Sequence, residues 1–223
     1  MSYIQAFRCG FCRPRIVLSL AFAAAALFAV PSARAQFNAP RTTQVHDASA
    51  LKPPAGARVA IVEFSDPECP DCARANPLLK EAAQKYGIPW VRHDFPLPYH
   101  PWGFQAAVNA RFLDTKGKKI GDDYRDYIFS NQNSIETMPQ LRQFTERFAA
   151  AHKIALPFAI DPTGKFTQAV KADYALGQRI GIDHTPTIWV VTNGAHAAPF
   201  VEVVDRSRLF QMIDQAIAQT RGH

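Results

Sequence analysis

Cysteines at a C-x-x-C spacing are the residues of this chain best suited to redox or metal chemistry. The chain contains four cysteines, which form the pairs Cys9/Cys12 and Cys69/Cys72. Such a pair can exchange disulfides, bind copper(I) through two thiolates, supply half of a zinc site or close a small structural loop. Structural zinc usually has four ligands, and a disulfide that closes so short a loop stabilises a fold by only about 2 kcal/mol. Redox exchange is therefore the favoured chemistry, with copper(I) transfer by a metallochaperone as the alternative.

The first cysteine pair lies in a segment that has the pattern of an export signal. Several arginines precede an apolar run over residues 16–30, and the small residues Ala33 and Ala35 fit a cleavage site. A bilayer span needs about 20 apolar residues, so an uncleaved anchor is the less favoured alternative. We predict that residues 1–35 are a signal peptide cleaved after Ala35. The mature protein is then periplasmic or otherwise extracytoplasmic, and only the second cysteine pair remains in it.

Composition and charge indicate a packed protein without affinity for nucleic acid. Hydrophobic residues make up 48% of the chain and charged residues 20%, which is typical of a domain with a sizeable core. The formal net charge is +6, but residues 1–35 contain four arginines and no acid. Without them, 21 basic and 19 acidic residues remain, so the net charge is +2. This balance gives no electrostatic reason to expect a nucleic acid partner.

The second cysteine pair lies in a predicted β-α-β unit. Residues 59–64 form an apolar, β-branched run typical of a buried parallel strand, residues 70–86 have a helical pattern, and residues 88–95 form a second strand pattern. Cys69 therefore lies at the start of a helix, where free amides and the helix dipole favour a thiolate. Cys72 lies one turn further into the helix and is expected to be more buried.

The rest of the chain has a mixed pattern. Residues 36–56 are proline-rich and polar, which predicts an extended lead-in. Strands are expected at 187–191 and 200–204, and a final helix at 207–220. Four further helices are expected, near Trp102–Leu113, Ile120–Asn131, Met138–His152 and Phe166–Ile180.

The sequence resembles the thioredoxin-fold thiol:disulfide oxidoreductases, in particular their exported DsbA-type branch. The features that carry the resemblance, across residues 55–220, are Pro70 after the first cysteine, Pro77 in the helix, Glu63 before the pair, and the segment 181–191 with Thr185 and Pro186. The resemblance implies an α/β fold, a thioredoxin fold in which helices flank a central mixed β-sheet. This domain spans 57–223, with a helical insertion at about 97–163, before the strand that follows a cis proline.

The resemblance also implies roles for individual residues. Cys69 forms the mixed disulfide with a substrate, and Cys72 resolves it. Glu63 is the buried acid that moves the Cys72 proton, unless it is instead the partner of a nearby lysine. Thr185 and Pro186 offer a backbone edge to an extended substrate peptide.

Three positions are expected to tune the redox properties of the pair. Pro70 follows the habit of the exported branch, but Asp71 stands where strong oxidants have histidine, so its carboxylate should make the Cys69 thiolate less favourable. His184 replaces a usual glycine and either stabilises that thiolate or is simply a solvated loop residue. The direction of the reaction therefore stays open between oxidation and reduction. Thr185 is more typical of isomerases than of DsbA-type oxidases.

The resemblance further implies the partners of the protein. The substrates are cysteine-containing exported proteins, and a membrane redox partner resets the pair. No cofactor or metal ion is expected. Because the lead-in is too short for a dimerisation domain, we expect a monomer, which favours an oxidase or reductase over an isomerase.

Overall fold

The computed structural model describes residues 42–194 and 198–221, so the predicted signal peptide and the first cysteine pair lie outside the described residues. The elements follow the chain in the order β1 (Val59–Ser65), α1 (Pro70–Tyr86), β2 (Trp90–Asp94), α2 (Gly103–Asp114), α3 (Lys118–Asn131), η1 (Gln132–Ser134), α4 (Met138–Ala151), α5 (Lys165–Ile180), β3 (Thr187–Thr192), β4 (Phe200–Glu202), η2 (Arg206–Arg208) and α6 (Leu209–Arg221). In this part of the chain, no helix combines the length and the apolar character that a bilayer crossing requires.

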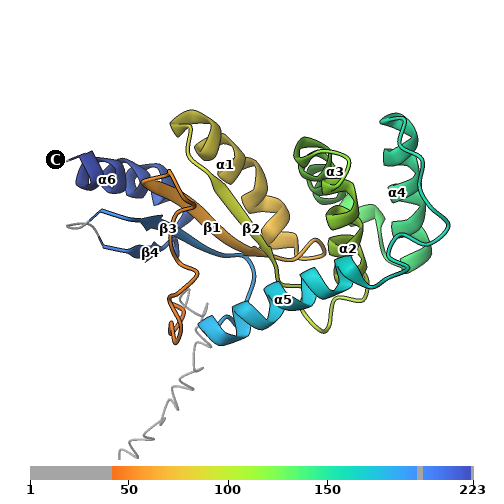
Figure 1. Ribbon diagram of the computed structural model, residues 1–223, viewed down its shortest axis with the longest axis horizontal. Helices are drawn as coiled ribbons and strands as arrows, with labels where there is room; N and C mark the ends of the chain where they lie inside the picture. The colour runs from red at the N-terminus through yellow and green to blue at the C-terminus, as the bar shows by residue number, and fades with distance from the viewer. Residues whose placement is uncertain (1–41, 195–197, 222–223) are drawn as a thin grey trace, which may run out of the picture. The chain divides into compact units, whose positions relative to one another are not determined.

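The four strands form one mixed sheet in the order β2-β1-β3-β4. β1 runs parallel to β2 and antiparallel to β3, and β3 runs antiparallel to β4. Every residue of β1 is buried, as expected for a central strand that is covered on both faces. Helices flank this sheet, which confirms the predicted α/β fold class with a central mixed sheet (Figure 1).

The two faces of the sheet have separate cores, because side chains alternate along each strand. Val59 and Ile61 of β1 pack with apolar residues of α1 and α6. Val62 and Phe64 pack with Phe95 and with the end of α5 on the opposite face. Figure 1 shows α1 and α6 on one side of the sheet and α5 on the other. β1 is thereby held in one register, and its last residues lead directly to the cysteine pair.

Helix α1 has the predicted bounds, and both of its ends have a local cause. Pro70 occupies the first turn, where a missing N–H leaves no hydrogen bond unmade. Gly87 ends the helix with a φ of 61°, a left-handed conformation that glycine adopts without a steric penalty. Pro77 lies inside the helix, as the motif predicted.

Helices α2, α3 and α4 have a core of their own beside the sheet. Trp102, Tyr124, Leu141 and Phe148 are buried there among other apolar residues. The predicted helices of this region are present, with ends shifted by one or two residues, and an irregular segment at 152–164 leads to α5. Buried polar side chains also form hydrogen bonds between these three helices. Helices α2, α3 and α4 are therefore a packed unit rather than a single crossover.

The C-terminal elements differ from the expected ones at their ends. The predicted strand 200–204 is shorter, because its pairing with β3 ends at Glu202. The predicted helix 207–220 begins instead as the 3-10 turn η2 and continues as α6. The Asp205 side chain accepts a hydrogen bond from the Ser207 amide and so starts this turn before the α-helix begins.

The lead-in is tied to the domain by hydrogen bonds far along the chain. The Thr43 amide and hydroxyl donate to the Glu202 carboxylate at 2.7 Å and 2.8 Å. The His46 amide donates to the Ile180 carbonyl at 2.9 Å. Leu51 is buried in the core beneath α5. The described part of the lead-in has bends and turns but no helix or strand, and it is bound to the domain by these contacts rather than free.

Replacing Gly177 with alanine should destabilise the protein. A Cβ atom here would lie 2.5 Å from Phe95 Cδ2 and 3.2 Å from Phe64 Cδ1, and both rings are buried. Overpacking costs about 1–3 kcal/mol, whereas the helix propensity of alanine returns at most about 1 kcal/mol. We expect a lower urea midpoint for Gly177→Ala and an unchanged or slightly higher one for Gln168→Ala, an exposed site on the same helix. A midpoint for Gly177→Ala at or above that of the wild type would contradict the close packing.

Candidate active site

The cysteine pair lies where β1 leads into α1. Cys69 is the N-cap of α1, and its carbonyl accepts a hydrogen bond from the Ala73 amide. Both cysteines are free thiols, with Cys69 6% exposed and Cys72 fully buried. The predicted order of burial is therefore present. A substrate sulfur can approach Cys69 only, because Cys72 has no accessible surface.

The two thiols have different electrostatic environments. A hydrogen bond from Cys72 contributes most to lowering the pKa of Cys69 to about 6, helped by the Thr185 side chain and the amides of Cys72 and Asp71, while burial opposes the shift. Burial raises the pKa of Cys72 well above its usual value, and the hydrogen bond to Cys69 adds to this. The reduced pair thus holds one negative charge on Cys69 and one proton on Cys72.

The loop before β3 faces Cys69. The Thr185–Pro186 peptide bond is cis, and Cys69 Sγ lies 3.3 Å from the Thr185 carbonyl oxygen, to which the thiol donates when it is protonated. Thr187 Oγ1 donates to the His184 carbonyl at 2.7 Å, which holds the turn at the start of β3. The structure therefore brings Thr185, 116 residues away in sequence, into contact with the nucleophilic sulfur.

Glu63 is buried in the centre of β1, below the thiol pair. Trp90 Nε1 donates to Glu63 Oε2 at 3.0 Å, and Arg92 lies opposite Glu63 in the β1–β2 register. Burial raises the pKa of Glu63, and the positive charge of Arg92 partly offsets this. The charge of Glu63 in turn raises the pKa of Cys72. The basic neighbour of Glu63 is thus an arginine rather than the lysine considered above, and the carboxylate acts on Cys72.

The place of Asp71 in the motif suggested a free negative charge beside Cys69, but in the structure its carboxylate is paired with two arginines. Arg206 Nη2 donates to Asp71 Oδ1 at 2.6 Å, and Arg74 Nη2 donates to the same oxygen at 3.1 Å. The groups of Asp71 that act on Cys69 include its backbone amide, which lowers the pKa of the thiol. Local sequence gave no sign of this arrangement, because Arg206 lies 135 residues away.

His184 lies on the exposed side of the same loop as Thr185. Its Nδ1 atom is 2.7 Å from Asp183 Oδ1, and its side chain is 45% exposed. Cys69 has no hydrogen bond to this ring in the described part of the chain. The position thus fits the solvated loop histidine better than the group that stabilises a thiolate.

Two acids next to the pair have roles that motif reasoning missed. Asp66 is fully buried and accepts hydrogen bonds from the Leu97 amide at 2.7 Å and from His100 Nδ1 at 2.6 Å. Glu68 accepts from the Trp102 and Gly103 amides at 2.6 Å and 2.7 Å, at the N-terminus of α2. Both carboxylates therefore anchor α2 to the thiol loop. The only local signal is that both acids come just before the predicted helix 70–86. That signal is misleading, because their carboxylates contact residues just before and at the start of α2, which are more than 30 residues away in sequence.

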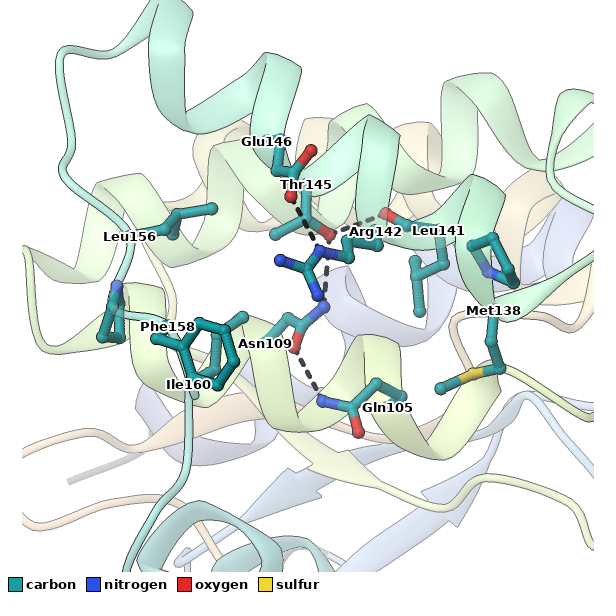
Figure 2. A pocket seen from close by; sticks show the side chains of 12 residues that line it. Gln105, Asn109, Met138, Leu141, Arg142, Thr145, Glu146, Leu156, Phe158 and Ile160 are labelled. Carbon is teal, nitrogen blue, oxygen red and sulfur yellow. Dashed lines mark hydrogen bonds and ion pairs between the residues drawn. The ribbon is translucent and has the colours of Figure 1, made fainter.

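A separate hollow lies within the helical region. It has a volume of ≈ 410 Å³ and is bounded by α2, α4 and residues 156–160. Figure 2 shows Gln105 hydrogen-bonded to Asn109, and the Arg142–Glu146 ion pair at the rim. None of the predicted site residues lines this hollow. Elsewhere in residues 42–194 and 198–221, no group of three or more His, Cys, Asp and Glu side chains is arranged to hold a metal ion.

Comparison with known proteins defines the family. The sequence model of a family described as Thioredoxin matches residues 55–206. The match covers more than half of the chain, and the chain therefore belongs to this thioredoxin family. A search of curated proteins found no match.

Solved structures with the same fold include three bacterial proteins. α-DsbA1 of Wolbachia pipientis has a TM-score of 0.62 and 17% identity, over 76% of this chain and 91% of that one. A periplasmic thioredoxin-like protein from Salmonella enterica serovar Typhimurium has a TM-score of 0.58 and 17% identity, over 74% and 87%. The thiol-disulfide exchange protein α-DsbA2 from Wolbachia pipientis has a TM-score of 0.55 and 17% identity, over 74% and 84%. These likenesses confirm the predicted thioredoxin fold.

The titration of the reduced protein should distinguish the two thiols. Thiolate absorbance at 240 nm should rise with a pKa of about 6 for Cys69, while Cys72 stays protonated up to alkaline pH. The pKa of Cys69 should increase in Cys72→Ala, because the hydrogen bond that contributes most is lost. Cys72→Ser keeps a hydroxyl donor and should increase it less. An equal pKa in both variants would show that hydrogen bonding from residue 72 does not stabilise the thiolate.

Proposed function

We propose that this protein exchanges disulfides with cysteine-containing exported proteins outside the cytoplasm. The observation that carries the proposal is the asymmetric pair at the start of α1, a thiolate-prone Cys69 in front of a buried, protonated Cys72. A thiolate near neutral pH is the nucleophile that disulfide exchange requires. One protein of the same fold, α-DsbA2 of Wolbachia pipientis, is a thiol-disulfide exchange protein, which agrees with this chemistry.

The proposed reaction has two steps. The Cys69 thiolate attacks a substrate disulfide, so that a Cys69–substrate bond forms, the substrate S–S bond breaks and one substrate thiolate leaves. Cys72 then gives its proton to the Glu63 carboxylate and attacks the Cys69 sulfur, which forms the Cys69–Cys72 disulfide and releases the second substrate thiolate. Two electrons pass from the pair to the substrate. The reverse sequence oxidises a substrate dithiol, and a membrane dithiol or disulfide partner resets the pair.

The surroundings of the pair give each remaining residue a place in this proposal. Thr185 and Pro186 offer an extended substrate a backbone edge beside Cys69, since such an edge can pair with a peptide in an extended conformation. Pro70 sets the start of α1, where amides meet the Cys69 sulfur. His184 is assigned no role beyond the loop.

The proposed location rests on the sequence and on the relatives. Residues 1–35 have the pattern of a cleaved signal peptide, and the domain that we propose begins at residue 57 and includes the helical insertion at about 97–163. One protein of the same fold, from Salmonella enterica serovar Typhimurium, is periplasmic. We propose a monomer, which sedimentation of the mature protein would test directly.

Substitution of each cysteine by serine should separate their roles. Cys69→Ser should abolish exchange, whereas Cys72→Ser should attack substrates and accumulate mixed disulfides, because the intramolecular thiol that resolves them at high effective concentration is missing. The measurement is non-reducing electrophoresis of exported proteins that are trapped by acid alkylation. Mixed disulfides on Cys69→Ser but not on Cys72→Ser would reverse the assignment of the nucleophile.

The proton-transfer role of Glu63 predicts a selective defect. Glu63→Gln should slow release of a mixed disulfide about 10- to 100-fold but leave the attack by Cys69 unchanged, since only Cys72 must lose a proton. Glu63 accepts that proton as a carboxylate, so in the wild type the release rate should fall as the pH drops through its raised pKa. This pH dependence should be absent in Glu63→Gln and intact in Glu81→Gln, an exposed acid on α1. Equal slowing of both steps would exclude a specific role in Cys72 deprotonation.

A further inference from the structure

Arg206 connects the last turn before α6 to the loop between the two cysteines. Its Nη2 atom donates to Asp71 Oδ1 at 2.6 Å, and its Nη1 atom donates to the Asp71 backbone oxygen at 3.1 Å. The two contacts use both ends of one guanidinium fork, which is a geometry that lysine cannot reproduce. Arg206 is therefore held against the C-x-x-C loop, although it lies on a different element.

The backbone contact acts on a peptide that also serves the nucleophile. The Asp71 carbonyl and the Cys72 amide belong to the same planar peptide unit. That amide is one of the donors that lower the pKa of Cys69. A hydrogen bond to the carbonyl end of a peptide polarises its N–H end, because hydrogen bonds in a chain strengthen one another. Arg206 thereby strengthens and orients an amide that points at the Cys69 sulfur.

The side-chain contact acts on the charge of the loop. Without Arg206, the Asp71 carboxylate would retain only Arg74, whose side chain is 67% exposed and contributes little as a surface pair. A carboxylate between the cysteines disfavours a second negative charge on Cys69. The pairing with Arg206 is less exposed, at 31% for the arginine, and offsets this repulsion.

The position of Arg206 is built into the fold. The preceding Asp205 caps η2 by accepting from the Ser207 amide, and the following Leu209 is fully buried. Arg208, the other arginine of η2, is exposed, and its backbone amide donates to the Asp205 carbonyl. The chain thus offers two arginines of the same turn, of which only Arg206 contacts Asp71.

We propose that Arg206 is a positioning residue of the thiol pair, which holds the Asp71–Cys72 peptide and neutralises the Asp71 carboxylate so that the reduced pair keeps its negative charge on Cys69. The inference deepens the proposed exchange function, because it names the residue that sets the stability of the reduced pair. Since stabilisation of the thiolate stabilises the dithiol form, loss of Arg206 makes the disulfide harder to reduce.

Arg206→Gln tests this directly. The pKa of Cys69, measured by thiolate absorbance, should rise by about half to one unit. At pH 7 this rise should shift the glutathione equilibrium roughly 3- to 5-fold towards the disulfide, because less of the reduced form is ionised. At about pH 5 both proteins hold a protonated Cys69, so the shift should disappear. The other ionisable groups near Cys69 are unchanged in the variant, namely Cys72, Glu63, Asp66, Glu68, Asp71 and Arg74.

Matched variants separate positioning from charge. Arg208→Gln removes the same charge from the same turn and should leave both quantities unchanged. Arg206→Lys keeps the charge without the fork and should give an intermediate value. The effect of Arg206→Gln should shrink in an Asp71→Asn background, but a part should persist, because the contact with the backbone carbonyl needs no carboxylate.

The outcomes bear on this proposal independently of the function. An unchanged pKa and an unchanged glutathione equilibrium in Arg206→Gln would overturn the proposal, as would equal shifts in Arg206→Gln and Arg208→Gln or an undiminished effect in the Asp71→Asn background. The pKa is measured on the reduced protein alone, so it is defined even if no exported substrate is found. A failure of the proposed function would instead appear as a lack of mixed disulfides in Cys72→Ser with the Arg206 effect intact.

Discussion

The unequal acidity of Cys69 and Cys72 is the constraint on which the site depends. It requires one sulfur to be ionised and the other protonated, and the burial of Cys72 enforces that division. The arrangement of the two sulfurs in turn depends on the first turn of α1, which starts a short loop after the buried strand β1. The buried sheet and the proline at the helix start therefore help to keep the pKa values of the Cys69 and Cys72 thiols apart.

Much of the site could be predicted because its signals are local. The spacing of Cys69 and Cys72, the strand before them and the glycine after the helix each depend on a few neighbouring residues, and the structure agrees with them. The contact of Thr185 with Cys69 came from a recognisable motif. The pairing of Asp71 with Arg206 could not be found in this way, because periodicity shows which face of an element is buried and not which distant side chain meets it.

The buried acids around the thiol loop show the same limit. Asp66 and Glu68 lie just before Cys69 in the sequence, but their positions alone do not show what their carboxylates contact. In the structure their oxygens accept amide and imidazole hydrogen bonds from the segment that starts α2. The approach is so close that a Cβ atom at Gly103 would lie 2.4 Å from Asp66 Oδ1. The helical region and the thiol loop are thus joined by the carboxylates of Asp66 and Glu68, which lie just before Cys69.

The bound lead-in imposes an order on biosynthesis. Thr43 and His46 are translated well before their partners Glu202 and Ile180. β1 likewise waits for β3 before its antiparallel side is paired. The described lead-in therefore has no docking surface until the end of α5 and β4 have been made. Closure of the domain over residues 43–51 must follow the synthesis of these two elements.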